Sequence, residues 1–88
     1  MSKKTIMKFY YTYVLLSDKD KKIYFGFTEN LLKRVKSHND GRVASTKNRR
    51  SLKLIYFEGC LNKKEVVKRE KSLKTGFGRA YLKRRIKI

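Results

Sequence analysis

The two stretches that decide the fold lie near the N-terminus: Phe9 to Leu16, FYYTYVLL, and Lys22 to Phe27, KIYFGF. Both are rich in aromatic and β-branched residues, a composition typical of β-strands. The residues that follow the first stretch, Ser17 to Asp20, are polar and suit a tight turn. Because so short a connection joins strands that run in opposite directions, the sequence predicts an antiparallel hairpin.

The next part of the chain predicts a helix, a loop and a third strand. Residues 28–30 (Thr-Glu-Asn) offer capping side chains for a helix from Leu31 to His38, and residues 39–41 (Asn-Asp-Gly) end it. Residues 42–51 form a basic loop. Leu52 to Glu58, LKLIYFE, predicts a third strand, which is apolar enough to lie at the centre of a small sheet.

The C-terminal part predicts two further helices. Asn62 caps a helix from Lys63 to about Lys74, and the glycines at 76 and 78 break it. A short basic helix then runs from Arg79 to Ile86. The predicted fold is therefore α/β of the α+β kind, a small three-stranded antiparallel sheet flanked by helices in the order β-β-α-β-α-α.

The composition favours a folded protein that binds a polyanion. The 88 residues include 25 lysines and arginines against 7 acids, a formal net charge of +18, which favours nucleic acid as the partner. An RNA–protein assembly, an acidic protein or a membrane surface are the alternatives. At 40% hydrophobic and 12% aromatic, the chain is too apolar for a disordered basic tail, so we expect one domain over residues 1–88.

Several classes of protein are excluded by what the sequence lacks. Cys60 is the only cysteine, which excludes an internal disulfide and a zinc site made of cysteines. No apolar run approaches the length of about 18 residues that a membrane span needs. The N-terminal residues have no hydrophobic segment of the kind that signal peptides carry. We therefore expect a cytoplasmic protein with no membrane partner.

Charged side chains interrupt the apolar stripe of both longer helices. In the first helix, Arg34 and His38 share a face with Leu31 and Val35, since steps of three and four residues keep side chains together. In the second helix, the apolar stripe carries an acid, Glu70. A salt bridge between Arg34 and Glu70, or a Glu70 that caps a backbone group, would explain this placement. A cleft in which Glu70 holds a hydrated divalent ion is the functional alternative.

The tyrosines are the second notable feature. Tyr11 and Tyr13 lie on one face of the first strand, and Tyr24 lies in the second strand. By themselves these are ordinary core aromatics whose hydroxyl groups reach water. Gly26, inside the second strand, indicates a bulge or a close approach of another group.

Taken together, these residues resemble the GIY-YIG nuclease family, in particular its small single-domain members similar to the N-terminal domain of the nuclease component of excinuclease ABC. Residues 11–13 (Tyr-Thr-Tyr) and 24–26 (Tyr-Phe-Gly) stand where the family has its two tripeptides, with the family's typical spacing. Arg34 stands where the family has its catalytic arginine. Residues 68–74, KREKSLK, resemble its metal-binding glutamate segment, with Glu70 as the ligand.

The resemblance implies a one-metal endonuclease that hydrolyses phosphodiester bonds in DNA, with structured or damaged DNA and a role in DNA repair as expectations. Glu70 would hold Mg²⁺ or Mn²⁺, Arg34 would clamp the phosphate, and Tyr13 would accept a proton from water with Tyr24 beside it. A nearby cation would lower the high pKa of the phenol. His38 would be an alternative base or a phosphate contact, or merely cap its helix.

Further contacts with the phosphate backbone are expected from basic side chains in the loop and in the last helix. These are Lys47, Arg49, Arg50, Arg79, Lys83, Arg84 and Arg85. A protein partner or a homodimer would supply specificity that so small a domain lacks. The alternative function is a non-catalytic nucleic-acid-binding module that retains the fold, because the tail has no asparagine where the larger nucleases of the family carry one.

Overall fold

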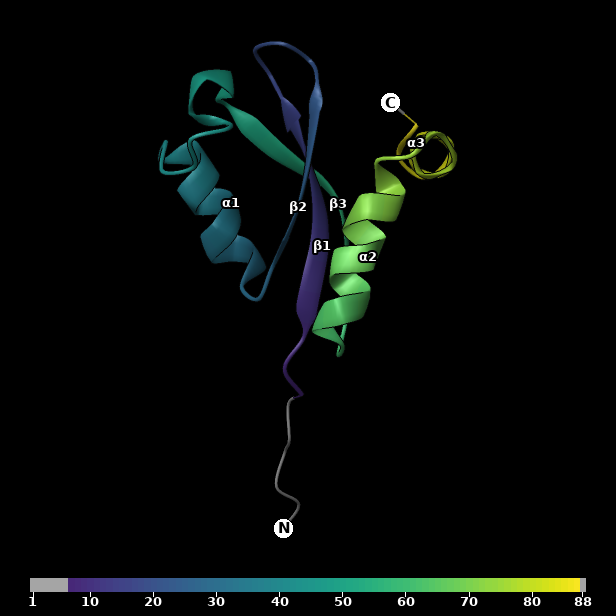
Figure 1. Ribbon diagram of the computed structural model, residues 1–88. Helices are drawn as coiled ribbons and strands as arrows, with labels where there is room; N and C mark the ends of the chain where they lie inside the picture. The colour runs from purple at the N-terminus through teal and green to yellow at the C-terminus, as the bar shows by residue number, and fades with distance from the viewer. Residues whose placement is uncertain (1–6, 88) are drawn as a thin grey trace.

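The computed structural model describes residues 7–87 and has the predicted order of elements (Figure 1). Three strands and three α-helices form, together with one short 3₁₀ turn, η1, in the basic loop. Their bounds are β1 Tyr10–Ser17, β2 Ile23–Thr28, α1 Leu31–Asn39, η1 Lys47–Arg49, β3 Leu52–Cys60, α2 Lys63–Leu73 and α3 Gly76–Ile86. The α+β fold class and the β-β-α-β-α-α order are therefore confirmed.

The three strands form one antiparallel sheet in the order β2-β1-β3. The prediction that the third strand is central is wrong, because β1 occupies that position and pairs with both neighbours. Tyr13 lies opposite Gly26 on one side and Phe57 on the other. The physical reason is burial: residues 12–15 of β1 are all buried, whereas Phe57 of β3 remains 51% exposed.

The helices cover both faces of the sheet, α1 on one side and α2 with α3 on the other (Figure 1). Because successive residues of a strand point to opposite faces, β1 contributes to two separate cores. The core under α1 is built on Tyr13, Leu15 and Leu52. The core under α2 and α3 is built on Val14, Phe25, Leu73 and Leu82.

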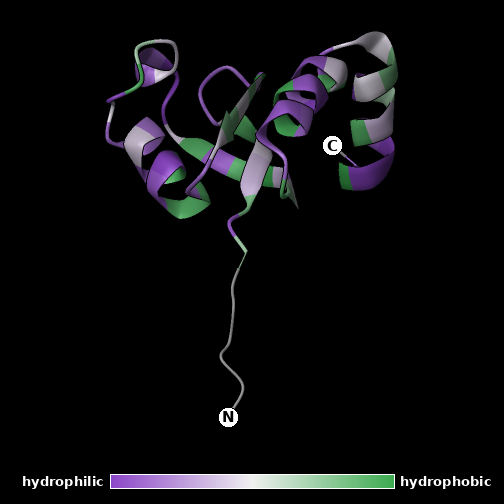
Figure 2. Cartoon of the chain, turned by 60° about the horizontal axis from the view of Figure 1, so that its bottom comes forward, coloured by the Kyte–Doolittle hydropathy of each residue, from purple (hydrophilic) through white to green (hydrophobic). Residues whose placement is uncertain are grey.

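Hydropathy follows the same layers. In Figure 2 the strands in the middle of the view are largely green and white with some purple, while the helices on either side carry both purple and green. This mixture is what helices with one packed face and one exposed face show. Over residues 7–87, none of the helices is both long and apolar enough to cross a membrane.

Polar side chains fix both ends of α1. At its start, the side chain of Asn30 accepts a hydrogen bond from the backbone N–H of Lys33 at 3.1 Å. At its end, the amide of Asn39 accepts from the N–H of Leu52 at 2.8 Å and donates to the carbonyl of Leu52 at 2.9 Å. Asn39 therefore ties the last turn of α1 to the first residue of β3, which holds the face of α1 against the sheet.

The last helix begins three residues earlier than predicted. Thr75, whose side chain accepts from the N–H of Gly78 at 3.2 Å, caps it, so both glycines lie inside α3 rather than between helices. Gly78 is buried where α3 meets the end of α2, and a Cβ there would collide with the Ser72 carbonyl oxygen and the Leu73 backbone. The glycine is therefore required for the close contact between the two helices, not for breaking them.

A second inward-facing charge on α2 holds the helices to the sheet. Arg69 donates to both oxygens of Glu58 in β3, at 2.9 Å from Nε and 2.8 Å from a terminal nitrogen. Its guanidinium also lies 4.9 Å from the ring centre of Tyr81 in α3. This pair joins β3, α2 and α3, so Glu58 and Arg69 serve the fold.

Candidate active site

The site is built around Tyr13, which has no exposed surface. Its ring crosses over its cross-strand neighbour Gly26. A Cβ on Gly26 would lie 2.5 Å from both Cζ and the hydroxyl oxygen of Tyr13. The close approach that a glycine inside a strand indicates is therefore present: the missing side chain leaves room for the phenol.

A chain of hydrogen bonds runs through the Tyr13 hydroxyl group. Nε of Arg34 donates to the Tyr13 oxygen at 3.2 Å. The Tyr13 hydroxyl lies 2.8 Å from Nε2 of His38, and Nδ1 of His38 lies 2.7 Å from the hydroxyl oxygen of Thr46. The four groups come from β1, α1 and the loop before β3, and among the described residues no buried side-chain nitrogen or oxygen lacks a partner.

One protonation state satisfies every group in this chain. The Thr46 hydroxyl can donate to the carbonyl of Val43 at 3.5 Å, which leaves its oxygen free to accept from His38 Nδ1–H. Nε2 of His38 then carries a lone pair and accepts the hydroxyl proton of Tyr13. Since the Tyr13 oxygen already accepts from Arg34, the proton of Tyr13 points at His38.

The electrostatics fit this state at neutral pH. Burial, helped by the charge of Arg34, lowers the pKa of His38 from 6.5 to about 4, so the ring is a neutral proton acceptor. Burial raises the pKa of Tyr13, and the hydrogen bond from Arg34 opposes that shift without reversing it. Arg34 thus acts on the pKa of this phenol in the expected direction, but burial outweighs it in the free protein. His38 is a buried hydrogen-bonding partner and its side chain does not cap the helix.

Tyr24 lies beside the pair and is the more accessible tyrosine. Its ring centre is 5.0 Å from that of His38 and 6.5 Å from that of Tyr13, and the residue is half-buried. The pKa of Arg34 is raised chiefly by its hydrogen bond to Tyr13, with a smaller contribution from Tyr24. Tyr13, Tyr24, Arg34 and His38 therefore converge on one side of the sheet, under α1.

Glu70 lies on the other helix layer and is only 7% exposed, so its predicted inward placement is confirmed. Its partner is Lys74, one helical turn further on, with Nζ 2.6 Å from Oε2. Within residues 7–87 there is no ion pair between Arg34 and Glu70, so a salt bridge between these two does not explain the inward acid. The Glu70 carboxylate nevertheless contributes to the raised pKa of Tyr13, which places the two within electrostatic reach.

Glu70 is the buried acid that could hold a metal ion. Among the described residues, no three His, Cys, Asp or Glu side chains gather into a metal-binding group. A hydrated Mg²⁺ needs only one or two carboxylates when substrate phosphates supply further oxygens. The donor set fits such an ion in that sense, because Glu70 is a hard oxygen ligand, and its partner Lys74 is half-exposed and free to turn away.

The seven basic residues expected to contact phosphates differ in how they are engaged. Arg49 pairs with Asp20 at 3.0 Å, Arg50 donates from Nε to the carbonyl of Lys47 at 2.8 Å, and Arg85 donates to the Tyr81 hydroxyl at 3.1 Å. Arg79 likewise donates from Nε to the carbonyl of Lys74 at 3.2 Å. These four therefore also serve local structure. The side chains of the other three are exposed: Lys47, Lys83 and Arg84.

Sequence reasoning missed two residues of the site. Lys74 follows Glu70 by four residues, a spacing that places the two on one helical face, so the ion pair was readable from the sequence. Thr46 gave no signal, because a threonine within a basic loop is ordinary. It is fully buried only because the loop folds back over α1, held by the bond from the Ser17 hydroxyl to the carbonyl of Arg49 at 2.7 Å.

The three-stranded antiparallel sheet carries two tyrosines and packs against an arginine on α1 and a glutamate on α2, the residue types that the resemblance to the GIY-YIG nucleases predicts at these places. Consistent with this, the sequence matches the GIY-YIG catalytic domain over residues 9–86, and the chain belongs to the GIY-YIG family.

Similar proteins occur in several bacteria. The chain is 46% identical over 65 residues to a UPF0213 protein of Clostridium perfringens, a match that covers 73% of this chain and 69% of that protein. It is 42% identical over 73 residues to a UPF0213 protein of Lactiplantibacillus plantarum, covering 80% and 71% respectively. The match to the UPF0213 protein YazA of Bacillus subtilis is 47% identical over 53 residues, 59% of this chain and 54% of that protein. These names state no activity, and no solved structure matches the chain.

Proposed function

We propose that this protein is a metal-dependent endonuclease that hydrolyses phosphodiester bonds in DNA. The observation that supports it best is the hydrogen-bonded chain from Arg34 through Tyr13 to His38, which combines a phosphate-binding cation with a proton path. Glu70, buried on the neighbouring helix layer, supplies the single carboxylate that such a site needs. Membership of the GIY-YIG family gives the nuclease class.

The proton path makes a buried phenol useful as a base. A tyrosine whose pKa is raised is a poor proton acceptor by itself. Tyr13 can accept a proton from the attacking water on its oxygen while its own hydroxyl proton passes to Nε2 of His38, 2.8 Å away. The oxygen of the water then bonds to phosphorus while the bond from phosphorus to the 3′ oxygen breaks. The leaving 3′ oxygen takes a proton from solvent, and His38 later returns its proton to solvent, which restores the neutral pair. His38 is suited to this because it is neutral before the reaction.

Arg34 controls access to Tyr13. In the free protein Tyr13 is fully covered and Arg34 donates to its oxygen, so water does not reach it. A phosphate attracts the guanidinium more strongly than a neutral phenol does, because charge-assisted hydrogen bonds are about twice as strong. Substrate binding therefore draws Arg34 onto the non-bridging oxygens and uncovers the base at the same time.

Glu70 would hold the divalent ion, Mg²⁺ or Mn²⁺, with the substrate phosphate completing its ligands. When bound, such an ion neutralises the phosphate and stabilises the leaving oxygen. In the free protein the ammonium of Lys74 pairs with Oε2 of Glu70, so it must move away before a metal ion can bind that oxygen.

The same ion pair supports a second candidate, a nucleic-acid-binding module without catalysis. A carboxylate neutralised by Lys74 adds little repulsion toward phosphates, so the basic surface would bind a backbone with Glu70 in a purely structural role. The two functions share the fold and the charge and differ in whether the bond is cut.

A cleavage assay on plasmid and branched DNA with Mg²⁺ or Mn²⁺ separates them. Glu70→Gln and Arg34→Ala should abolish cleavage, while the matched controls Glu65→Gln and Lys33→Ala, at exposed positions on the same helices, should retain it. Binding measured in EDTA should persist in Glu70→Gln. Equal cutting by Glu70→Gln and Glu65→Gln would disprove the proposed site, and tight binding without any Glu70-dependent cutting would establish the binding module.

A further inference from the structure

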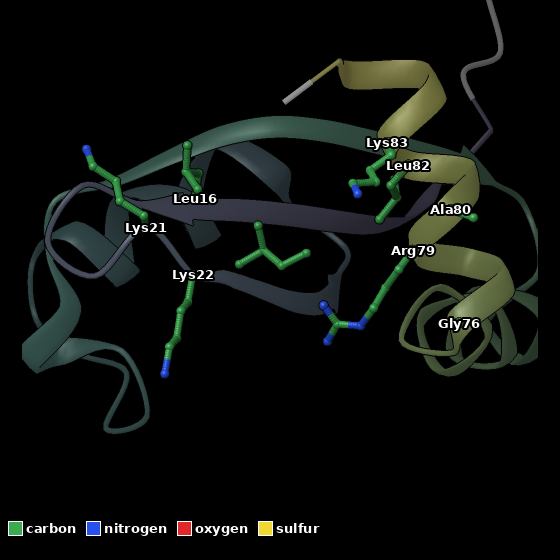
Figure 3. A pocket seen from close by; sticks show the side chains of 9 residues that line it. Leu16, Lys21, Lys22, Gly76, Arg79, Ala80, Leu82 and Lys83 are labelled. Atoms are coloured by element: carbon green, nitrogen blue, oxygen red, sulfur yellow. The ribbon is translucent and has the colours of Figure 1, made fainter.

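A groove of about 900 Å³ lies on the face of the sheet opposite Tyr13, between the β1–β2 hairpin and α3. Figure 3 shows Arg79 extending from α3 toward the strands, with Lys21 and Lys22 on the hairpin side. Its floor is aliphatic, made by Leu16, Ile23 and Leu82. Neither the proposed chemistry nor the packing of the core uses this space.

The charged residues that line the groove are all basic. Four cationic side chains line it, and no aspartate or glutamate does: Lys21, Lys22, Arg79 and Lys83. None of the four forms an ion pair with any residue in the 7–87 part of the chain. By contrast, Arg49 and Arg69 both have carboxylate partners. A hollow bordered by unpaired positive charges is complementary to a polyanion.

The groove and the candidate active site are separated by the thickness of one strand. Tyr24 and Gly26 face the site, while Ile23 and Phe25 between and beside them face the groove side. β2 is an edge strand of the sheet, so a ligand can pass around it. Arg79 of α3 reaches β2 on the groove side, since its guanidinium lies 5.2 Å from the ring centre of Phe25.

A second connection runs through the end of α2. Nε of Arg79 donates to the carbonyl of Lys74 at 3.2 Å, and the ammonium of Lys74 pairs with Glu70. The groove wall therefore begins within a few residues of the proposed metal ligand. A nucleic acid strand with one phosphate at Glu70 would reach the groove with the nucleotides that follow.

The aliphatic floor of the groove favours an unpaired strand of nucleic acid over a duplex. A duplex presents phosphates and sugars and keeps its base faces stacked inside, so it would leave the apolar floor against a hydrated backbone. An unpaired strand offers base faces for an apolar surface together with phosphates for the basic rim, the combination that single-strand-binding grooves use.

We infer that this groove binds an unpaired strand of the nucleic-acid substrate, and that the enzyme cuts next to a junction between paired and unpaired segments. The inference rests on the proposed nuclease function, because the Glu70 site fixes the phosphate from which the strand enters the groove.

Fluorescence anisotropy in EDTA tests the inference without cleavage. One probe is a DNA duplex with a single-stranded overhang, and the other is a blunt duplex with the same number of phosphates. The groove variant is Lys22→Ala with Lys83→Ala, and its matched control is Lys64→Ala with Lys71→Ala, two exposed lysines of α2 outside the groove. Ala80→Glu places a carboxylate at an exposed groove position without disturbing the core.

The wild type and the control should prefer the overhang probe. The groove variant should lose that preference, with a log–log salt slope for the overhang shallower by about 1.4, from roughly 0.7 per lost phosphate contact on single strands. Ala80→Glu should weaken the overhang complex alone. Equal affinity of the wild type for both probes, or equal behaviour of groove and control variants, would overturn the inference. Cleavage that depends on Glu70 is measured in a separate assay. Its absence would reject the nuclease function, whereas the anisotropy measurements would still show whether the groove binds an unpaired strand.

Discussion

The hydroxyl group of Tyr13 and Nε2 of His38 lie 2.8 Å apart in the core, although the two residues are 25 positions apart in the chain. Burial shifts both groups away from their charged forms, since the pKa of Tyr13 is raised and that of His38 is lowered to about 4. The pair is therefore uncharged at neutral pH and holds one transferable proton. The free energy of unfolding of the protein, as well as the proposed reaction, should depend on both groups being uncharged.

Acid should weaken the fold through His38 before any carboxylate titrates. Because the folded-state pKa lies below the ordinary 6.5, the unfolded chain binds the extra proton first. The contribution of neutral His38 is fully present above pH 6.5 and is lost as the pH falls toward 4. Urea denaturation between pH 7 and 5 should show a falling unfolding free energy.

The chain has a single histidine, so the control is unambiguous. The variant His38→Gln should be less stable at pH 7 and nearly independent of pH down to 5, where carboxylates with ordinary pKa values near 4 begin to titrate. Parallel curves for the wild type and the variant would show that His38 is not held neutral by the fold.

Gly26→Ala should disconnect Tyr13 from His38. The added Cβ would lie 2.5 Å from the Tyr13 hydroxyl oxygen, so the ring must move, at a cost of about 1–3 kcal/mol for an overpacked core. We expect loss of cleavage together with lower stability. Gly59→Ala is the matched control, because its Cβ would lie 3.1 Å from the Tyr11 ring, outside the site. Full cleavage activity in Gly26→Ala would show that the position of the Tyr13 hydroxyl is not needed for the reaction.

Much of the fold could be predicted from the sequence, because the spacing of apolar residues indicates which side of a strand or helix is packed. The order of strands and helices followed from alternation and capping, and Glu70 stood out as an acid on an apolar stripe. The order of strands within the sheet did not follow, since β1 and β3 are both apolar and only their burial by helices on two faces separates them.

The site was less predictable than the fold for a physical reason. The pKa of Tyr13 is decided by its complete burial and not by the neighbouring charge of Arg34, and burial depends on how α1 packs. Thr46 enters through the path of a loop, which no periodicity describes. The groove combines the hairpin with α3, segments that lie far apart in the sequence.

The two glycines of α3 should respond oppositely to alanine. At Gly78 a Cβ would collide with the backbone of Ser72 and Leu73, which cannot move aside as a flexible side chain would, so Gly78→Ala should destabilise by several kcal/mol. At Gly76 a Cβ would meet nothing within 4 Å, so Gly76→Ala should be neutral or stabilise by up to about 1 kcal/mol. Thermal unfolding compares them directly. Similar melting temperatures would contradict the close contact of α2 and α3.

Lys21→Gly should make the protein more stable and a poorer binder of overhang DNA. Lys21 has φ of 60°, a left-handed conformation that costs a non-glycine residue about 1 kcal/mol and that glycine adopts freely. The substitution also removes one cation from the groove. The free energy of unfolding, from chemical denaturation, should therefore rise, while the affinity for overhang DNA, from anisotropy, should fall. Lys19→Gly, in the same turn but outside the groove, should change neither in this way.

Lys74→Met should lower the Mg²⁺ or Mn²⁺ concentration needed for half-maximal cleavage. The ammonium of Lys74 lies 2.6 Å from Glu70 Oε2 and competes with a cation for that oxygen. Since the lysine is half-exposed, the pair contributes up to about 1 kcal/mol, equivalent to a shift of roughly fivefold. Methionine keeps the length and helix propensity of the side chain without its charge, and Lys71→Met, at an exposed lysine without an ion pair in the described chain, is the control. If cleavage by Lys74→Met instead falls at every metal concentration, Lys74 binds the substrate phosphate and does more than compete with the metal ion for Glu70.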